Sequence, residues 1–466
     1  SNSAGTSYVL NLENSNRDEG GFVDFEQIQG LEGLVVANVV DNPQDARKGA
    51  RKRIKSLITH NDGAHWAPIQ PPAIDVDNQR YCSGQSLEQC SLHLHGYTEQ
   101  ADYRDTFSSS SAVGMMIGVG NVGSELESYY DGNTYLTKDG GVSWKEVKKG
   151  VYLWEYGDQG SVIVMVNGKD NTNVLSYSVD EGDTWQEYKF TDEQITVEDI
   201  STVPGDNSLV FLLFTRVPLA RGDKTRVFRI DFGELLSDSC SGTDLETWIP
   251  KHPFQADDCL FGHQMQYTRK IPGRLCRIGS QKLDQAAIIK TCQCTRQDFE
   301  CDFNYYQDQN GDCKLVSGVK LPGHEDMCAI EESGEYYPVT GYRKVPLSTC
   351  EGGLQLDRSD KPVSCDAAEE DHLRSEFGRL LWFWLKIVIV GSLVVAVVFK
   401  YLQLRHGEIR LDDEETIDIS KWTALKTTVL DWTVSLQQAA KDCVFKRVPL
   451  TTSVSDEDED DFTDQV

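Results

Sequence analysis

Basic residues are scarce in this sequence. Its 466 residues include 45 Lys and Arg against 74 Asp and Glu, which gives a formal net charge of −29. Because a nucleic-acid binder needs cations to neutralise phosphates, this balance excludes a general DNA- or RNA-binding protein. The G-x-S-x-G pattern of a serine nucleophile is also absent, as is any N-x-S/T acceptor for an N-linked glycan. The hydrophobic fraction of 39% is still enough for a folded core.

Two motifs that resemble ligand sites fit simpler interpretations. Gly118-x-Gly120-x-x-Gly123 matches a dinucleotide fingerprint, but the polar segment 124–135 follows where that motif needs a helix. We therefore assign these glycines to a turn between strands. His93 and His95 would lie on one side of a strand, either as a metal pair or, with a better fit, as part of a polar strand face. We predict no catalytic residue, no cofactor and no metal site.

One apolar run is long enough to cross a membrane. Residues 380–399 read LLWFWLKIVIVGSLVVAVVF, with Lys386 as the single charge. Twenty such residues span a hydrocarbon core, and a run this long and this rich in Val and Ile is unusual for the buried helix of a soluble protein. The sequence therefore predicts a transmembrane helix over residues 380–403.

The cysteines indicate the orientation of this helix. Of the 13 cysteines, 12 precede the span, an even number that suits paired disulfides in an oxidising lumen. Only Cys443 follows it, as expected in a reducing cytosol. We predict a type I protein with residues 1–379 luminal and a cytosolic C-terminus. Since the chain begins at Ser1 without a signal peptide, we expect that a preceding portion has been lost.

Three segments of the first half repeat one pattern, [ST]-x-[DN]-x-G-x-x-W. The Asp or Asn can accept hydrogen bonds from the backbone amides of a turn, the Gly can adopt a positive φ, and the Trp can cover the turn. This is the Asp-box, a structural turn of sialidases and of several non-enzymatic propellers, and we call the three segments box turns. Their motif positions are Thr59, Asn61, Gly63 and Trp66; Thr137, Asp139, Gly141 and Trp144; and Ser178, Asp180, Gly182 and Trp185.

The spacing of the box turns indicates propeller blades. Trp144 and Trp185 are 41 residues apart, and Trp66 and Trp144 are 78 apart, close to twice that. A period near 40 with strand-rich segments between suggests four-stranded blades, with one unmarked blade between the first two box turns. Residues 1–235 then hold between five and six blade lengths. We expect strands over 33–40, 161–166, 209–215 and 225–230.

Cysteine becomes dense after this region. Ten cysteines lie from Cys240 to Cys365, where apolar runs are few, so covalent cross-links are expected to replace a large core. Zinc is the alternative, but Cys292 and Cys294 are separated by one residue and no second close pair complements them. Disulfides therefore fit better than zinc.

Several segments resemble the sortilin family. Segments 259–270, 292–294 and 294–305 (CLFGHQMQYTRK, CQC and CTRQDFECDFNY) are similar to its ten-cysteine module. Segments 31–40, 90–99, 114–123 and 151–166 are similar to the last blades of its propeller. The resemblance covers nearly all of residues 1–403. Because propellers of this family have ten blades, it implies that the chain is the C-terminal part of a longer receptor.

The resemblance and the patterns together predict an all-β fold class. We expect a partial β-propeller over residues 1–235, a disulfide-rich ten-cysteine module over 236–366, a stalk over 367–379, the transmembrane helix and a mostly disordered tail over 404–466. The family pattern implies the disulfide pairs Cys240–Cys276, Cys259–Cys292, Cys294–Cys350, Cys301–Cys313 and Cys328–Cys365, with Cys82–Cys90 closing a small loop in one blade.

The tail carries two candidate sorting signals. Residues 455–464 contain seven acids and no base, which fits either a solvated end or an adaptor signal that an acidophilic kinase would strengthen. Apolar residues spaced three and four apart form a helical stripe that would need a membrane surface or a partner. The candidate residues are Trp422, Leu425, Val429, Trp432, Leu436, Ser453, Ser455, Asp456, Glu457, Asp458 and Glu459.

The resemblance implies a sorting receptor and no enzyme. Such a receptor binds soluble vacuolar hydrolases, carboxypeptidase Y among them, in the trans-Golgi network and delivers them to a prevacuolar endosome. Its tail recruits coat adaptors and retromer-like recycling machinery. The alternatives are a surface signalling or adhesion receptor and, with less support, a membrane-anchored glycosidase. We also expect luminal histidines to gain charge near pH 6 and to contribute to acid-driven release.

Overall fold

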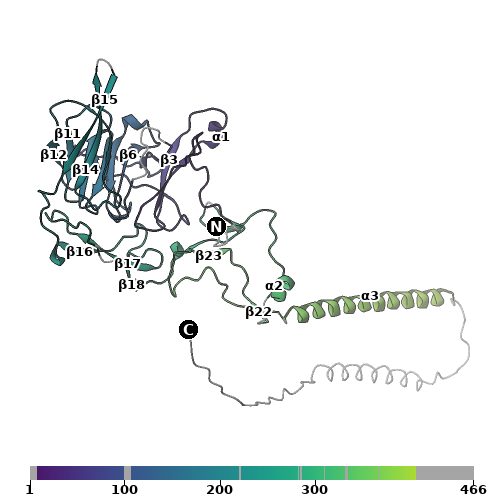
Figure 1. Cartoon of the computed structure of the whole chain (residues 1–466). Helices are drawn as coiled ribbons and strands as arrows, with labels where there is room; N and C mark the ends of the chain where they lie inside the picture. The colour runs from purple at the N-terminus through teal and green to yellow at the C-terminus, as the bar shows by residue number, and fades with distance from the viewer. Residues whose placement is uncertain are drawn as a thin grey trace, which may run out of the picture. The chain divides into compact units, whose positions relative to one another are not determined.

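The computed structural model describes residues 8–98, 107–219, 222–281, 283, 286–308, 310–330, 334–365 and 367–405. Contacts divide the chain into two units, Ser1–His372 and Leu373–Val466. Strands dominate the first unit and a long helix, α3, continues into the second (Figure 1). The predicted all-β fold class with a disulfide-rich module and one apolar helix is confirmed.

Three antiparallel sheets of four strands form successive blades, each built from strands in sequence order. Blade 1 contains β1 (Phe25–Gln27), β2 (Val35–Val40), β3 (Ile54–Thr59) and β4 (Ala67–Pro68). Blade 2 contains β5 (Ser91–Leu94), β6 (Met116–Gly123), β7 (Asn133–Thr137) and β8 (Lys145–Lys148). Blade 3 contains β9 (Tyr152–Gly157), β10 (Val162–Asn167), β11 (Val174–Ser178) and β12 (Gln186–Lys189).

A fourth sheet has three strands in the described residues: β13 (Thr196–Ser201), β14 (Val210–Leu219) and β15 (Gly222–Asp231). The hairpin β14–β15 is the longest pairing and extends beyond the other strands (Figure 1). The short helices beside the blades are α1 (Pro43–Ala46) and the 3₁₀ turn η1 (Tyr129–Asp131).

Strand β10 shows why the blades stack. Its residues alternate between two hydrophobic clusters, because successive side chains of a strand point to opposite faces. Ile163 and Met165 pack in the cluster shared with blades 1 and 2, while Val162, Val164 and Val166 pack in the cluster shared with the fourth sheet. All five are fully buried. A strand that is apolar on both faces therefore joins its blade to both neighbours.

The predicted unmarked blade and the predicted number of blades were wrong. The three box turns lie between β3 and β4, β7 and β8, and β11 and β12, which are three consecutive blades. The spacing of 78 residues comes from two long connections around β5, residues 69–90 and 95–115, rather than from an extra blade. The described residues contain four blade sheets where five to six were predicted.

The cysteine-rich module consists of small sheets. The largest contains β16 (Leu245–Trp248), β17 (His263–Lys270) and β18 (Ala287–Thr291). Three two-stranded sheets follow, β19 (Phe299–Cys301) with β23 (Tyr342–Lys344), β20 (Tyr305–Gln307) with β21 (Cys313–Leu315), and β22 (Glu335–Tyr336) with β24 (Val363–Ser364). The 3₁₀ turns η2 (Gly242–Asp244) and η3 (Arg296–Asp298) and the helix α2 (His324–Ile330) connect them.

Disulfides supply most of the core of this module. One buried cluster consists of Cys240, Cys276 and Ile278, and another of Cys294, Phe299 and Cys350. So little apolar material would not hold the module without cross-links. The bonds are Cys82–Cys90, Cys240–Cys276, Cys259–Cys292, Cys294–Cys350, Cys301–Cys313 and Cys328–Cys365, the pairs that the family resemblance implied.

Helix α3 runs over Ala367–Arg405. Within it, Gly378–Val398 is long and apolar enough to cross a membrane, and none of this segment is buried. Residues 367–379, predicted as the stalk, lie in the same helix. The tail beyond residue 405, with Cys443 and all the candidate sorting residues from Trp422 to Glu459, lies outside the described residues.

Candidate functional site

The box turns close as their pattern predicts. In blade 2 the Thr137 hydroxyl donates to Asp139 Oδ1 (2.8 Å) and accepts from the Gly141 amide (3.0 Å). Asp139 Oδ1 also accepts from the Ser143 amide (2.9 Å), and Gly141 has a φ of +84°. The equivalent amide-to-side-chain bonds are His65 to Asn61 in blade 1 and Thr184 to Asp180 in blade 3.

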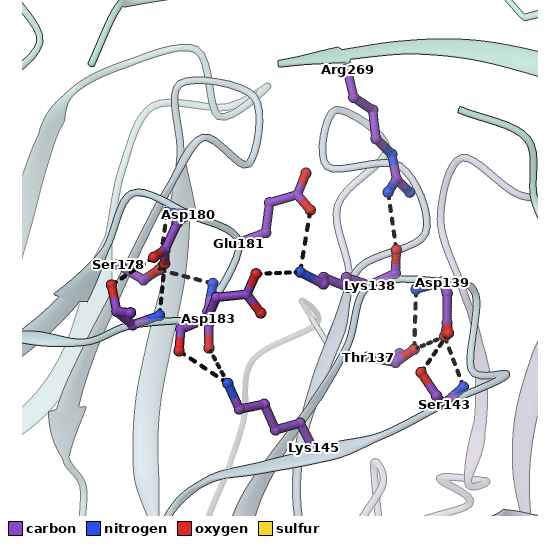
Figure 2. Close-up of polar contacts among 12 residues, drawn as sticks. Thr137, Lys138, Asp139, Ser143, Lys145, Ser178, Asp180, Glu181, Asp183 and Arg269 are labelled. Carbon is purple, nitrogen blue, oxygen red and sulfur yellow. Dashed lines mark hydrogen bonds and ion pairs between the residues drawn. The ribbon is translucent and has the colours of Figure 1, made fainter. Parts of the chain in front are cut away.

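Neighbouring box turns are joined by lysines (Figure 2). Lys145 Nζ donates to the backbone oxygens of Gly182 (3.2 Å) and Asp183 (3.1 Å). Lys138 Nζ pairs with Asp183 Oδ2 at 2.8 Å and lies 3.9 Å from Glu181 Oε2. Each lysine belongs to blade 2 and each partner to the box turn of blade 3, so these contacts join the edges of two neighbouring blades.

The box glycines also pack against the preceding blade. A Cβ on Gly141 would collide with Ile58 of β3, and a Cβ on Gly182 would collide with Leu136 of β7. The glycine is therefore required twice, for its positive φ and for the close approach of two blades. Only the first reason is visible in the sequence.

Arg269 of β17 fastens the cysteine-rich module to blade 2. Its guanidinium donates to the carbonyl of Lys138 (3.0 Å; Figure 2) and to that of Val113, and its Cζ lies 3.4 Å from the centroid of the Trp248 ring. Burial lowers the pKa of Arg269 to about 10, an effect that the nearby charge of Glu181 opposes. Only 9% of the residue is exposed. One side chain thus ties the module to two connections of blade 2.

The contact region between the cysteine-rich module and the blades, which we call the joint, also includes polar contacts to blades 1 and 3. The fully buried Asp158, in the turn after β9, accepts from the amides of Ile278 (3.0 Å) and Gly279. Gln159 donates to the carbonyls of Gly279 and Gln281, both at 2.8 Å. In blade 1 the side-chain amide of Asn61 donates to the backbone oxygen and to Oε1 of Gln297 in η3. The module therefore lies across three box-turn edges.

Three histidines meet at the blade 1 end of the joint. The His60 and His252 ring centroids are 6.3 Å apart, and His65 makes an edge contact with Phe254. Burial is the main cause that lowers the pKa of His60 and of His252 to about 4, and mutual repulsion with His252 lowers that of His60 further. Burial also lowers the pKa of His65. The expectation that histidines gain charge near pH 6 is wrong for His60 and His252.

Two hollows lie between the blades and β17. The first, of about 360 Å³, is lined by residues of blade 3, Arg269 and Lys270, and burial lowers the pKa of Lys270 to about 8. The second, of about 340 Å³, is lined by Phe261, His263 and Met265 and by the loop between β1 and β2, residues 28–34, which we call the blade 1 loop. Tyr267 and Ala286 line both, so the hollows are neighbours.

The motifs set aside in the sequence have structural positions. Gly118, Gly120 and Gly123 lie within β6, not in a turn as predicted, and a Cβ on Gly120 would collide with the His93 carbonyl of the paired strand β5. His93 and His95 are buried, and His93 shares its side of β5 with Ser91, whose hydroxyl lies 3.3 Å from His93 Nε2. His93 Nδ1 accepts from the Ser56 amide (3.0 Å), and burial lowers its pKa to about 4.

Two clusters of polar side chains resemble a metal site and a glycosidase site. Asp257, Cys259 and Cys292 offer atoms within 4.8 Å of one another, but the two sulfurs are joined in a disulfide and are no thiolate ligands. Tyr81 donates to the buried Glu146 at the outer strand β8. The cation paired with this carboxylate is Lys149 at 2.9 Å, whereas a sialidase needs an arginine cluster. Neither cluster organises a catalytic centre.

The residues of the joint were not predicted. Arg269, Asp158 and Gln159 belong to segments whose resemblance to the sortilin family is visible in the sequence, but nothing local marks them as contact residues. Their partners are 120 or more positions away.

Comparisons with known proteins match the chain almost throughout. The sequence model described as "Sortilin, neurotensin receptor 3," matches residues 1–200, and that described as "Sortilin, neurotensin receptor 3, C-terminal" matches residues 202–365. The two meet at the end of β13, whereas we predicted a boundary after residue 235. The fourth sheet shares a hydrophobic cluster with blade 3, so it packs against blade 3 as a further blade.

Three similar proteins carry the name Vacuolar protein sorting/targeting protein 10. That of Candida dubliniensis is 45% identical over 440 residues, that of Aspergillus terreus 45% over 430 and that of Debaryomyces hansenii 48% over 436. The matches cover 89%, 89% and 88% of this chain and 28%, 29% and 27% of those proteins. The chain thus spans less than a third of their length. With blades, module and matches in agreement, the chain belongs to the sortilin family.

Proposed function

We propose that this chain is part of a type I sorting receptor that carries soluble vacuolar proteins, carboxypeptidase Y among them, from the trans-Golgi network to a prevacuolar endosome and then returns. The observation that carries the proposal is the identity of 43% to 48% with proteins named for vacuolar sorting and targeting, over both the blades and the module. Residues 1–379 are luminal in this proposal.

The use of the polar groups at the joint supports a binding function over a catalytic one. These groups are used in fixing one part of the molecule on another, as with Asp158 and Arg269. The joint leaves two hollows with apolar walls, a surface suited to recognising a protein segment. One apolar helix fits attachment to a membrane, so that cargo and coat can be coupled across it.

The proposal is tested in a fungal strain that lacks its own receptor of this kind. The chain, joined to the preceding part of a relative such as that of Debaryomyces hansenii, should restore intracellular retention of carboxypeptidase Y. Secretion of the precursor at the level of the empty strain would contradict the proposal. Steady-state residence at the plasma membrane would instead favour a surface signalling or adhesion receptor.

The tail is tested with two variants of the same chimera. Deletion of residues 453–466, or Trp432→Asp in the apolar stripe, should mislocalise the receptor and increase secretion of the precursor. Cargo binding in detergent extract should be unchanged, because neither variant alters the luminal part. Normal cycling of both variants would refute the proposed adaptor and recycling signals.

A further inference from the structure

The second hollow has features of a peptide site that no family match assigns. We propose that it binds an extended segment of a partner protein in which an apolar side chain stands next to an arginine or lysine. We call it the rimmed groove and define it by Glu32, Leu34, Asp258, Phe261, Met265 and Tyr267. The inference rests on the proposed function, since it names the chemistry of cargo that this site would recognise.

The floor of the rimmed groove is a sheet face. Met265 and Tyr267 are two apart on β17 and therefore point to the same side. Ile288 of β18 pairs directly with Met265, so it lies on that face beside Met265, next to the lining of the hollow, and it is 52% exposed. Leu31 and Leu34 of the blade 1 loop form the opposite wall. A volume of about 340 Å³ between them suits one or two aliphatic side chains.

Two carboxylates without partners stand at the rim. Glu32 is exposed and Asp258 is half-buried. Within the described part of the chain, neither forms an ion pair or accepts a hydrogen bond at its carboxylate. Burial, and after it the charge of Glu32, raise the pKa of the Tyr267 hydroxyl, which places Glu32 against the floor. Two carboxylates beside an apolar floor, with no cation paired to them among the described residues, are complementary to a cation flanked by apolar groups.

The wall between rim and floor is strained. Phe261 has a φ of +51°, a value that a bulky side chain rarely adopts, and Asp258 has a φ of +52°. The Phe261 ring packs where a Cβ of Gly33 would otherwise lie, which holds it against the blade 1 loop. Strain of this kind persists where the surrounding structure requires it and is frequent at ligand clamps. The wall is thus pre-formed by both parts of the molecule.

These features select a peptide over other occupants. A small apolar ligand would not use the two carboxylates, whereas an extended strand presents side chains on alternate sides and can place a base at the rim and an aliphatic group in the hollow. The neighbouring hollow, reached past Tyr267 and Ala286, can take a second apolar side chain of the same segment.

The test uses the whole 466-residue chain in detergent micelles and fluorescent synthetic peptides. The probe is GSRALALSGS, compared with versions in which Arg is replaced by Glu or both Leu by Ser. Fluorescence anisotropy should show binding of the first peptide and weaker binding, by about fivefold or more, of the other two. Equal binding of all three would overturn the proposal.

Matched variants assign the binding to the rimmed groove. Glu32→Gln combined with Asp258→Asn should abolish the preference for Arg over Glu, and Ile288→Asp should reduce binding about fivefold or more. Asp170→Asn, an exposed carboxylate in the loop before β11, and Val227→Asp, also 52% exposed but on β15, should leave binding unchanged. If the groove variants behave like these controls, the proposal fails.

Two further readouts separate the possible causes of failure. If the chain binds no peptide while the chimeric receptor still retains a vacuolar precursor, the groove is refuted and the sorting function stands. If peptide binds as expected but no precursor is retained, the sorting function fails and the groove stands. If Ile288→Asp instead dissociates a dimer in analytical ultracentrifugation without changing peptide binding, a second copy of this chain covers the groove and the proposal is overturned.

Discussion

Replacing Arg269 by Met should loosen the cysteine-rich module from the blades. The change removes two hydrogen bonds from a charged donor to the carbonyls of Lys138 and Val113, each worth about 1.5–3 kcal/mol, and a cation–π contact with Trp248 worth about 1 kcal/mol. It also relieves the burial of a charge. The lowering of the Arg269 pKa from its ordinary value to about 10 corresponds to about 3 kcal/mol of that cost.

The lost contacts outweigh the relief, so we expect a net destabilisation of about 1–4 kcal/mol. Urea unfolding of the whole chain in detergent, followed by tryptophan fluorescence, should show a midpoint lower by about 1 M. Amide hydrogens of β17 should exchange faster in the variant, because the joint opens before the blades unfold.

Two comparisons make this prediction refutable. Arg269→Lys keeps the charge, but one ammonium group has no planar fork to bond both carbonyls and stack on Trp248, so it should remain destabilised. Arg229→Met removes an exposed arginine paired with Asp231 and should change stability by less than about 0.5 kcal/mol. If Arg269→Met matches Arg229→Met, or if Arg269→Lys is as stable as the wild type, the fork geometry does not hold the joint.

Three other perturbations test the box turns, the histidines and the module. Gly141→Ala should destabilise more than Gly150→Ala in thermal unfolding: both have a positive φ, but only Gly141 has a neighbouring blade within 4 Å, and equal losses would refute the packing role. His60 and His252 stay neutral in the folded state to about pH 4 while the unfolded chain takes up protons below about pH 6.5. Stability should therefore be full above pH 6.5 and fall towards pH 4 by up to about 1.4 kcal/mol per pH unit for each histidine; replacing both with Gln should flatten this slope, and an unchanged slope would contradict the reasoning. Cys301→Ser should cost roughly 2–5 kcal/mol and retain the protein early in the secretory pathway, which thermal unfolding and localisation would show; normal export at wild-type stability would contradict it.

The number of blades shows where sequence patterns mislead. The distance from Trp66 to Trp144 is close to two periods, yet both lie in consecutive blades. A long connection costs little loop-closure entropy, so an insertion within one blade (residues 95–115) and a long link between two blades (residues 69–90) are both tolerated. Spacing alone therefore does not separate an insertion from an extra blade.

Sequence patterns also fail to show which residues are buried. An apolar or glycine-rich strand can be recognised, but not which neighbour covers it. Gly120 reads as a turn residue because glycine is common in turns, while its actual position in β6 is required by the His93 carbonyl of the paired strand. The sequence places His93 and His95 on one side of a strand, but only the tertiary packing decides that both are buried.

The sequence by itself determined what is local: the box turns, whose side chains bond amides within four residues, the apolar span in α3, and the cysteine-dense module. Turn motifs and the length of an apolar run depend on residues that are contiguous in the chain, so both can be recognised directly in the sequence. Only the tertiary structure decided the joint. Arg269 reaches Lys138, Asp158 reaches Ile278, and the rimmed groove forms between β17 and the blade 1 loop, because partners more than a hundred residues apart meet only after the blades have stacked.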